Sequence, residues 1–329
     1  MILAIETSCD DTCAAVVEPD GRGVLSNVVH TQTEHSRYGG VVPEVASRAH
    51  LERLDGVIWK ALSDADTDLA DVERVAVTTR PGLIGALLVG VAAAKGLAYA
   101  RGLPLVPVNH LEGHVAAAYL TDQELEPPFV ALIASGGHTA LYSVDAARDM
   151  HLLGETLDDA AGEALDKGAR MLGLGFPGGP ALQRVASEGG GDRERYDFPV
   201  ALKERDNLDF SFSGLKTSLL YKLKELGEPR GELPHLAASY EAAVVEALVR
   251  KLLRAADIHD TPALVVAGGV AANALLRRTL EEKCAGAGLK LVVPPPELCT
   301  DNAAMIGAAA PHTPAIDYPD YVDLNARSV

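Results

Sequence analysis

Short apolar runs alternate with longer segments of helical character along the whole chain. The runs have the length and composition of buried strands; they occupy residues 1–6, 13–17, 75–77, 105–108, 129–133, 140–144, 264–266 and 291–293. The longer segments have an apolar face at helical spacing or are rich in small residues; they occupy residues 45–62, 84–99, 109–120, 272–283 and 301 onward. Hairpin strands followed by strand–helix units are typical of an α/β protein whose mixed sheets are covered by helices.

The order of these elements occurs twice. The turn after the first run contains Ser8 and Thr12, and a turn further along contains Ser135 and Thr139 at the same spacing. The strand–helix pairs that follow the first turn also recur after the second. We therefore interpret the chain as two copies of one unit.

The spacing between matching elements grows by about 60 residues along the chain, so the second copy carries an insert between residues 145 and 260. We predict an N-terminal lobe of residues 1–123 and a C-terminal lobe of residues 124–329. A helical insert is expected at roughly residues 150–235, and the two lobes should face each other across a cleft.

Two histidines and a distant aspartate form a candidate metal site. His110 and His114 are four residues apart at a helix start, so their side chains point from the same helix face. The repeat places Asp301 at the equivalent helix start of the other lobe. Two imidazoles and one carboxylate, with positions left for water or substrate, are a typical ligand set for Zn²⁺ or Fe²⁺. The alternative is a solvated histidine pair and an Asp301 N-cap, although a capping carboxylate can also bind a metal.

Charge restricts how the chain can bind nucleic acid. Its 329 residues carry a net charge of −17, so an RNA contact requires a local basic patch or a helper protein. The best candidate patch combines cations with aromatic residues, a solvated helix being the alternative; its members are Lys203, Arg205, Lys216, Lys222, Lys224, Phe210 and Phe212.

Four cysteines without a C-x-x-C pair form no disulfide framework. We find no signal peptide and no apolar run long enough to span a membrane, which predicts a cytoplasmic enzyme.

Two glycine turns are candidates for holding phosphate or carbonyl oxygens with backbone amides. The first is residues 135–138, where a tight hairpin turn is an equal alternative. Within it, His138 is either a general base or an exposed turn residue. The second is residues 268–273, between a strand and a helix, where Asn273 either contacts adenosine or ribose or caps the helix.

Seven segments together resemble the bacterial TsaD family of tRNA N6-adenosine threonylcarbamoyltransferases, formerly called O-sialoglycoprotein endopeptidases. The segments are IETSCDDT at 5–12, HLEGH at 110–114, SGGHT at 135–139, GEALDK at 162–167, FSFSGLKT at 210–217, AGGV at 267–270 and CTDN at 299–302. The resemblance extends from residue 2 to about residue 325. It implies an actin/Hsp70/sugar-kinase-like fold, which agrees with the repeat described above.

The resemblance also implies a metal-dependent acyltransferase. Such an enzyme moves the threonylcarbamoyl group from threonylcarbamoyl-AMP to N6 of the adenosine 3′ of the anticodon, in tRNAs that read codons starting with A. One divalent metal, Fe²⁺ or Zn²⁺, would be held by His110, His114 and Asp301, and His138 would assist catalysis. The implied substrate contacts are Ile133, Ala134, Ser135, Gly136, Gly137, Asp166, Gly179 and Asn273.

The implied partners are tRNA, a TsaB-type paralogue, a TsaE-type ATPase and a TsaC-type enzyme that supplies the intermediate. ATP or ADP is a further candidate ligand, and no membrane is involved.

Three other functions share parts of this pattern. A small-molecule kinase of the same fold class would use Asp10 or Asp11 and would leave the histidine pair without a purpose. A metalloprotease would carry Glu directly after the first His, whereas Glu112 is two positions on and points about 200° around the helix. An actin-like scaffold regulated by ATP would bind nucleotide without group transfer.

Overall fold

The chain divides into two compact units in its computed structural model, which describes all residues except 39, 122, 146–148, 205, 228, 230 and 329. Unit 1 comprises Met1–Glu124 and Thr300–Val329, and unit 2 comprises Leu125–Cys299. Each unit contains a five-stranded mixed sheet with a buried apolar core of its own.

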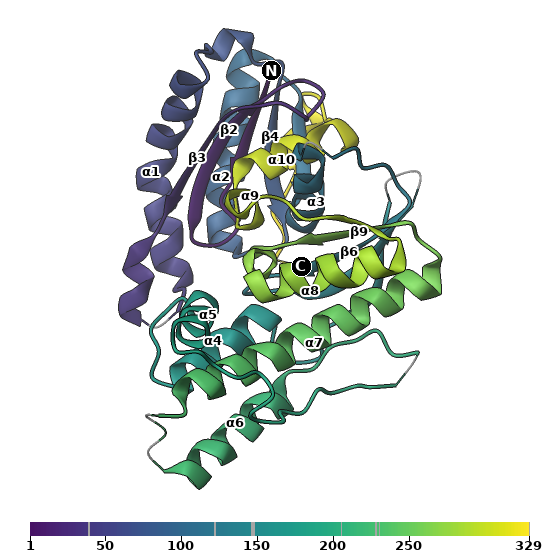
Figure 1. Cartoon of the computed structure of the whole chain (residues 1–329). Helices are drawn as coiled ribbons and strands as arrows, with labels where there is room; N and C mark the ends of the chain where they lie inside the picture. Colours follow the sequence, from purple (N-terminus) through teal and green to yellow (C-terminus); the bar gives the residue numbers. More distant parts are fainter. Residues whose placement is uncertain are drawn as a thin grey trace. The chain divides into compact units, whose positions relative to one another are not determined.

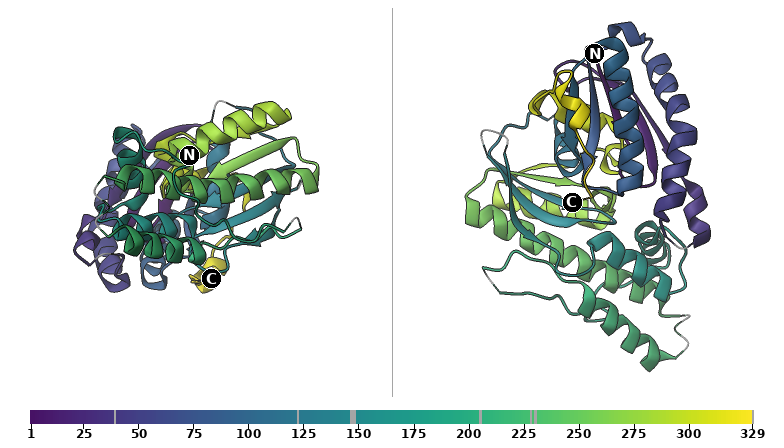
Figure 2. Two further views of the ribbon diagram at one scale, coloured as in Figure 1. Left: turned by 60° about the horizontal axis from the view of Figure 1, so that its bottom comes forward. Right: turned by 180° about the vertical axis from the view of Figure 1, so that it is seen from behind.

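Unit 1 is a sheet with helices on both faces (Figure 1). Its strands are β1 (Ile2–Glu6), β2 (Asp11–Val17), β3 (Val24–Thr31), β4 (Arg74–Arg80) and β5 (Leu105–Asn109), in the order β3-β2-β1-β4-β5. Its helices are α1 (Pro43–Asp64), α2 (Ile84–Arg101), α3 (His110–Ala116) and α10 (Ala303–Ala309). Leu3 and Ile5 of β1 share a core with α1 and α2, which lie side by side in purple and blue in Figure 2. Ala4, which points to the opposite face, lies against Gly307 of α10.

Unit 2 has the same kind of sheet, covered by a larger set of helices. Its strands are β6 (Phe129–Ala134), β7 (Thr139–Val144), β8 (Met150–Glu155), β9 (Ala263–Ala267) and β10 (Lys290–Val292), in the order β10-β9-β6-β7-β8. Its helices are α4 (Ala161–Met171), α5 (Gly178–Glu188), α6 (Ser213–Leu226), α7 (Leu233–His259), α8 (Ala274–Ala287) and α9 (Pro296–Cys299). Leu132, Leu141 and Val266 of the sheet share one core with α4, α7 and α8.

The two sheets confirm the predicted duplication. In unit 1, the central strand β1 pairs antiparallel with β2 and parallel with β4. In unit 2, the central strand β6 pairs antiparallel with β7 and parallel with β9. The outer strands follow the same rule, since β3 and β8 are antiparallel to their neighbours while β5 and β10 are parallel to theirs.

The apolar pattern does not predict the third strand of either sheet. β3 and β8 are edge strands with many exposed residues, so neither contains a continuous run of apolar side chains. Because β8 belongs to the sheet, the helical insert begins later than residue 150. It also extends past residue 235, since α7 continues to His259.

The end of the predicted C-terminal lobe is corrected by the structure. Residues from Thr300 onward belong to unit 1, where α10 packs on α3 and on the sheet. The following segment pairs with β5, because Leu105 and Ile316 exchange backbone hydrogen bonds of 2.9 and 2.8 Å. The chain therefore returns to its first unit after completing the second.

Helix α2 is long and apolar enough to cross a membrane by length and composition alone, contrary to the expectation that no segment is. Its buried residues are Ala86, Leu87, Gly90, Val91, Ala94 and Ala98. They pack in the core that α2 shares with α1 and the sheet. Core packing therefore accounts for the buried face of α2, which is a third of the helix.

Candidate metal centre and active site

Helix α3 carries two histidines on one buried face. It follows β5 directly, and the Asn109 side chain caps it by accepting a hydrogen bond from the Leu111 amide at 2.8 Å. His110 and His114 are only 5% and 1% exposed. Their ring centroids lie 4.6 Å apart in an edge-to-face arrangement. The two imidazoles therefore share one helix face, as their spacing predicts.

Asp301 reaches the histidines from the segment just before α10. The cap of α10 is Asn302, whose buried side chain accepts a hydrogen bond from the Met305 amide at 3.0 Å, so Asp301 is not the N-cap. Helices α3 and α10 approach closely at Gly113, where an added Cβ would lie 2.7 Å from Ile306 Cδ1. Glycine at this position allows the histidine helix to lie directly against α10.

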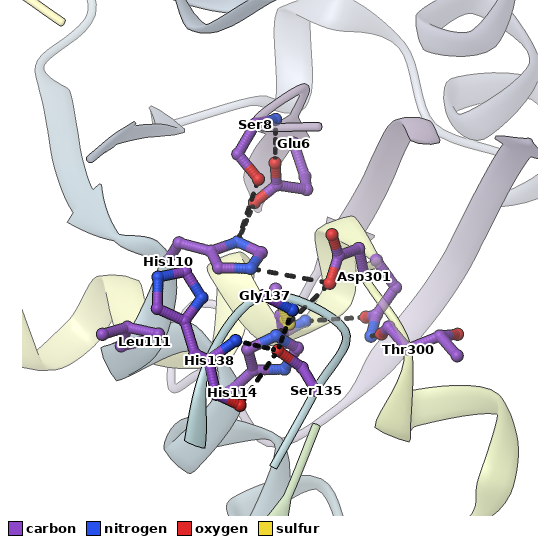
Figure 3. A network of polar contacts seen from close by, with 12 residues as sticks. Glu6, Ser8, His110, Leu111, His114, Ser135, Gly137, His138, Thr300 and Asp301 are labelled. Atoms are coloured by element: carbon purple, nitrogen blue, oxygen red, sulfur yellow. Dashed lines mark hydrogen bonds and ion pairs between the residues drawn. The ribbon is translucent and has the colours of Figure 1, made fainter. Parts of the chain in front are cut away.

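The three side chains form one compact group (Figure 3). Asp301 Oδ1 lies 3.5 Å from His110 Nε2 and 3.3 Å from His114 Nε2, and the three ligand atoms all lie within 4.8 Å of one another. All three residues belong to unit 1. The expectation that the opposite lobe supplies the carboxylate is therefore corrected, and the group is complete within one unit.

This donor set fits a divalent cation. Metal–ligand bonds of about 2.0–2.1 Å in tetrahedral geometry place neighbouring ligands roughly 3.3 Å apart, which is close to the two separations between Asp301 Oδ1 and the histidine nitrogens. Both ring nitrogens of His114 are buried, and neither has a hydrogen-bond partner among the described residues. A buried polar atom without a partner is costly. A cation bound to one of these nitrogens would remove that cost for this nitrogen.

Neighbouring carboxylates make the surroundings of the group negative. Burial by itself lowers the pKa of His110, but the charges of Asp301 and Glu6 outweigh burial and raise this pKa to about 9. Burial raises the pKa of Asp11 to about 7, and the charges of Asp301, Asp10 and Glu6 act in the same direction. Negative charge is thus gathered in a poorly solvated place, where a cation would be stabilised.

In unit 2, the turn between β6 and β7 contains the first predicted ligand-binding segment. The Ser135 amide donates to the His138 carbonyl at 2.8 Å, and Ser135 Oγ accepts from the amides of Gly137 and His138 at 3.3 and 3.0 Å. The amides of Ser135 and Gly137 are therefore engaged inside the turn. Added Cβ atoms at Gly136 and Gly137 would meet nothing within 4 Å, so the turn has an open face. No hydrogen bond within this fully described turn uses the Gly136 amide.

Three other predicted substrate contacts, Ile133, Ala134 and Asp166, lie outside this turn. Ile133 and Ala134 end β6 as fully buried sheet residues. Asp166 of α4 accepts a hydrogen bond from the Gly178 amide at 2.6 Å, at the first residue of α5. Burial raises the pKa of this carboxyl, and the amides of Gly178 and Gly179 oppose that shift. Asp166 therefore already occupies the amides at the start of α5.

Asn273 caps helix α8, as one of its two predicted roles requires. Its side-chain oxygen accepts from the Leu276 amide at 2.9 Å, and its nitrogen donates to Glu241 at 2.6 Å. Gln183 of α5 accepts a hydrogen bond from the Ala274 amide at 2.8 Å. The start of α8 therefore lies beside α5, the helix that Gly178 and Gly179 begin.

The predicted RNA patch is wrong in its aromatic part. Phe210 and Phe212 are only 2% and 1% exposed, and their rings stack with an interplanar angle of 8°. These rings belong to the core and cannot stack on bases. Lys216 is engaged in an ion pair with Asp159, and Arg205 lies outside the described residues.

Comparison with known proteins identifies the family. The family model of TsaD, the tRNA N6-adenosine threonylcarbamoyltransferases, matches residues 23–308. The chain belongs to this family. It is 54% identical over 309 residues to the tRNA N6-adenosine threonylcarbamoyltransferase of Syntrophus aciditrophicus (strain SB), covering 93% of the chain and 90% of that protein. The protein of the same name from Anaeromyxobacter dehalogenans (strain 2CP-C) is 54% identical over 314 residues, covering 94% and 93%.

The chain is therefore an enzyme, a transferase that threonylcarbamoylates tRNA. Among solved structures, component A of the Acidaminococcus fermentans (R)-2-hydroxyglutaryl-CoA dehydratase superposes with a TM-score of 0.54 at 15% identity, covering 98% of the chain and 99% of that protein. At this identity the likeness concerns the fold alone. That fold is the actin/Hsp70/sugar-kinase-like one that the TsaD resemblance implies.

Two residues next to the candidate metal ligands have no role in the sequence-based prediction. Glu6 lies 2.9 Å from His110 Nδ1, and Thr78 donates to Glu6 at 2.6 Å. One signal in the sequence points to them. Glu6 ends an otherwise apolar strand, and a carboxylate in that position must be met by buried donors.

We expect Gly268→Ala to lower the free energy of unfolding of this TsaD protein by about 2–4 kcal/mol. Gly268 has a φ of +88°, and an added Cβ would lie 2.8 Å from the backbone carbon of Ala134. The substitution therefore strains its own backbone and pushes β6 and β9 apart. Denaturant unfolding measures the change.

Gly286→Ala in α8 is the matched control, because an added Cβ there meets nothing within 4 Å and the residue is helical. It should be neutral or stabilise by up to about 1 kcal/mol. Equal stability of the two variants would contradict the tight packing at Gly268.

Proposed function

We propose that this chain transfers the threonylcarbamoyl group from threonylcarbamoyl-AMP to N6 of the adenosine 3′ of the anticodon, in tRNAs that read codons starting with A. The observation that carries the proposal is the His110–His114–Asp301 group in a chain of the TsaD family. The acceptor amine is a poor nucleophile, so the carbonyl carbon of the donor must be made more electrophilic.

We propose that the three side chains hold one divalent metal, Fe²⁺ or alternatively Zn²⁺, since two imidazoles and a carboxylate suit either ion. When bound, the metal supplies Lewis-acid chemistry toward an oxygen of the threonylcarbamoyl group. His110 and His114 contribute neutral nitrogens and Asp301 contributes one charge, which leaves the ion a net positive charge with which to polarise the donor.

Unit 2 offers the groups that would bind the nucleotide part of the donor. The open face of the Gly136–Gly137 turn suits a phosphate or carbonyl oxygen. Asp166 already accepts the amide at the start of α5, so its remaining capacity suits hydroxyl donors such as those of ribose. Asn273 and Gly179 lie at the starts of α8 and α5. The same groups would accept ATP or ADP, and His138 would take the proton from the attacking amine.

We further propose that the chain works with tRNA, a TsaB-type paralogue and a TsaE-type ATPase, in the cytoplasm, on an intermediate made by a TsaC-type enzyme. Support for a protein partner comes from the outer surface of α1 and α2. There Leu51, Trp59 and Tyr99 are 69%, 65% and 66% exposed, and Trp59 borders a groove of about 260 Å³ between the two helices. Large exposed apolar side chains in one region are typical of interaction sites.

We expect Trp59→Glu to weaken binding of the TsaB-type partner by at least about 30-fold, since a buried interface tryptophan is commonly worth 2 kcal/mol or more. Folding should be unaffected, because the side chain is exposed. Titration with the purified partner and thermal unfolding measure both effects. Ile258→Glu, at a 43% exposed position in unit 2, should leave binding unchanged; equal binding by all three proteins would exclude this surface.

The proposed function is tested by reconstitution. The chain, its partners, the TsaC-type enzyme and unmodified tRNA are combined, and the nucleosides of the digested tRNA are analysed by mass spectrometry. The metal content of the same preparation is measured. We expect threonylcarbamoylated adenosine that depends on the chain and on its metal. Phosphorylation of a small metabolite without tRNA would instead support the kinase alternative.

A further inference from the structure

Glu6 is the charged residue of a strand whose other four residues are apolar. It ends β1, all five residues of which are fully buried. Taking a carboxylate out of water costs several kcal/mol unless hydrogen bonds replace the lost solvation. Its presence in the strand therefore calls for a specific set of donors.

Three elements supply these donors. Thr78 of β4, the strand beside β1, donates its hydroxyl to Glu6 Oε2 at 2.6 Å. The Ser8 amide, in the turn after β1, donates to Oε1. The third neighbour of the carboxylate is His110, whose Nδ1 lies 2.9 Å from Oε2 (Figure 3). The carboxylate is thus satisfied on both oxygens.

The third contact determines which nitrogen of His110 carries hydrogen. Glu6 accepts from the Ser8 amide on Oε1 and from the Thr78 hydroxyl on Oε2, so both of its oxygens act as acceptors. A carboxylate that accepts on both oxygens takes a hydrogen bond from His110 Nδ1 at 2.9 Å, and Ser8 Oγ, 3.2 Å from the same nitrogen, is a hydroxyl that can accept from it as well. When a cation takes the place of the second proton, the lone pair of the ring lies on Nε2, which is the nitrogen directed toward Asp301 at 3.5 Å.

His114 has no comparable support. Among the described residues, neither of its ring nitrogens makes a hydrogen bond, and its Nε2 lies 3.3 Å from Asp301 Oδ1. Of the two imidazoles, only that of His110 is therefore held in one tautomer by a buried carboxylate. The two histidines contribute differently to the site although they share a helix face.

We propose that Glu6 is a positioning residue, which holds His110 in the Nδ1–H tautomer and directs Nε2 to the cation. The inference rests on the proposed metal site. Hydrogen bonding to a carboxylate also makes the opposite ring nitrogen a stronger donor to metal.

The test is metal binding by Glu6→Gln in the otherwise intact chain. Metal-free wild type and variant are titrated with Zn²⁺, and with Fe²⁺ under anaerobic conditions, using a competing chelator. We expect the variant to bind about 10- to 100-fold more weakly. Glu52→Gln, at an exposed position of α1, should bind as the wild type does. Unchanged affinity of a folded Glu6→Gln protein would overturn the proposal.

A second measurement needs no variant at the buried position. In the Zn²⁺-bound wild type, ¹⁵N NMR of the imidazoles should find Nδ1 of His110 protonated and Nε2 bound to metal. The reverse assignment would overturn the proposal. This measurement is decisive even if Glu6→Gln fails to fold. Wild-type protein that takes up neither ion would instead refute the proposed metal site itself, so the two failures are distinguishable.

Discussion

Replacing His110 with alanine should remove the bound metal and lower tRNA modification by at least about 100-fold, because Lewis-acid polarisation is worth several kcal/mol of transition-state stabilisation. Two donors, His114 and Asp301, would remain, which is too few to retain a catalytic ion. The metal content of the purified variant and the rate of nucleoside formation should fall together.

A matched control is His151→Ala, which removes an exposed histidine paired with Asp145 in unit 2. Its metal content and activity should equal those of the wild type. Because His110 also bonds Glu6, thermal unfolding of His110→Ala must show a folded protein before its activity is interpreted. Full modification by a folded, metal-free His110→Ala protein would refute the metal-dependent mechanism.

Phe212→Ala should destabilise unit 2 by about 3–5 kcal/mol, the usual cost of removing a buried aromatic ring and leaving a cavity. Phe212 is 1% exposed, and its ring stacks on Phe210 at a centroid distance of 6.4 Å. Denaturant unfolding measures the loss. The result bears on function, because the sequence pattern alone placed this aromatic ring in an RNA-binding patch.

Tyr221→Ala provides the comparison within the same segment, since this aromatic residue on α6 is 65% exposed. Its effect on stability should stay within about 0.5 kcal/mol. A Phe212→Ala protein that keeps its stability but loses affinity for tRNA would restore the patch hypothesis and contradict the core position of the ring.

Most of the fold is predictable because the sheets are built from central strands buried on both sides. β1, β4 and β9 are apolar runs, and each can be recognised as a buried strand from its own residues alone. The edge strands β3 and β8 were missed for the opposite reason. Half of each edge strand faces solvent, so its stability comes from pairing with a neighbour that no local pattern identifies.

The return of the chain to unit 1 after Thr300 was also missed. In the repeat, residues 291 onward match residues 105 onward, which suggests that α10 accompanies the second sheet. Instead, the small residues of α10 allow close packing on β1 and β2, as at Gly307 beside Val17. Packing between distant segments determines which sheet α10 covers. The periodicity of a helix in the sequence does not contain this information.

By itself, the sequence determined the duplicated α/β architecture, the family, and the pairing of His110 with His114, because all of these depend on short-range spacing or on recognisable motifs. Only the tertiary structure decided that Asp301 joins the histidines within one unit, that Phe212 is a core residue, and that Glu6 of β1 supports His110, which follows a strand two positions away in the sheet. Each of these contacts joins residues that are far apart in the chain, and burial and hydrogen-bond partners exist only once the segments have packed together.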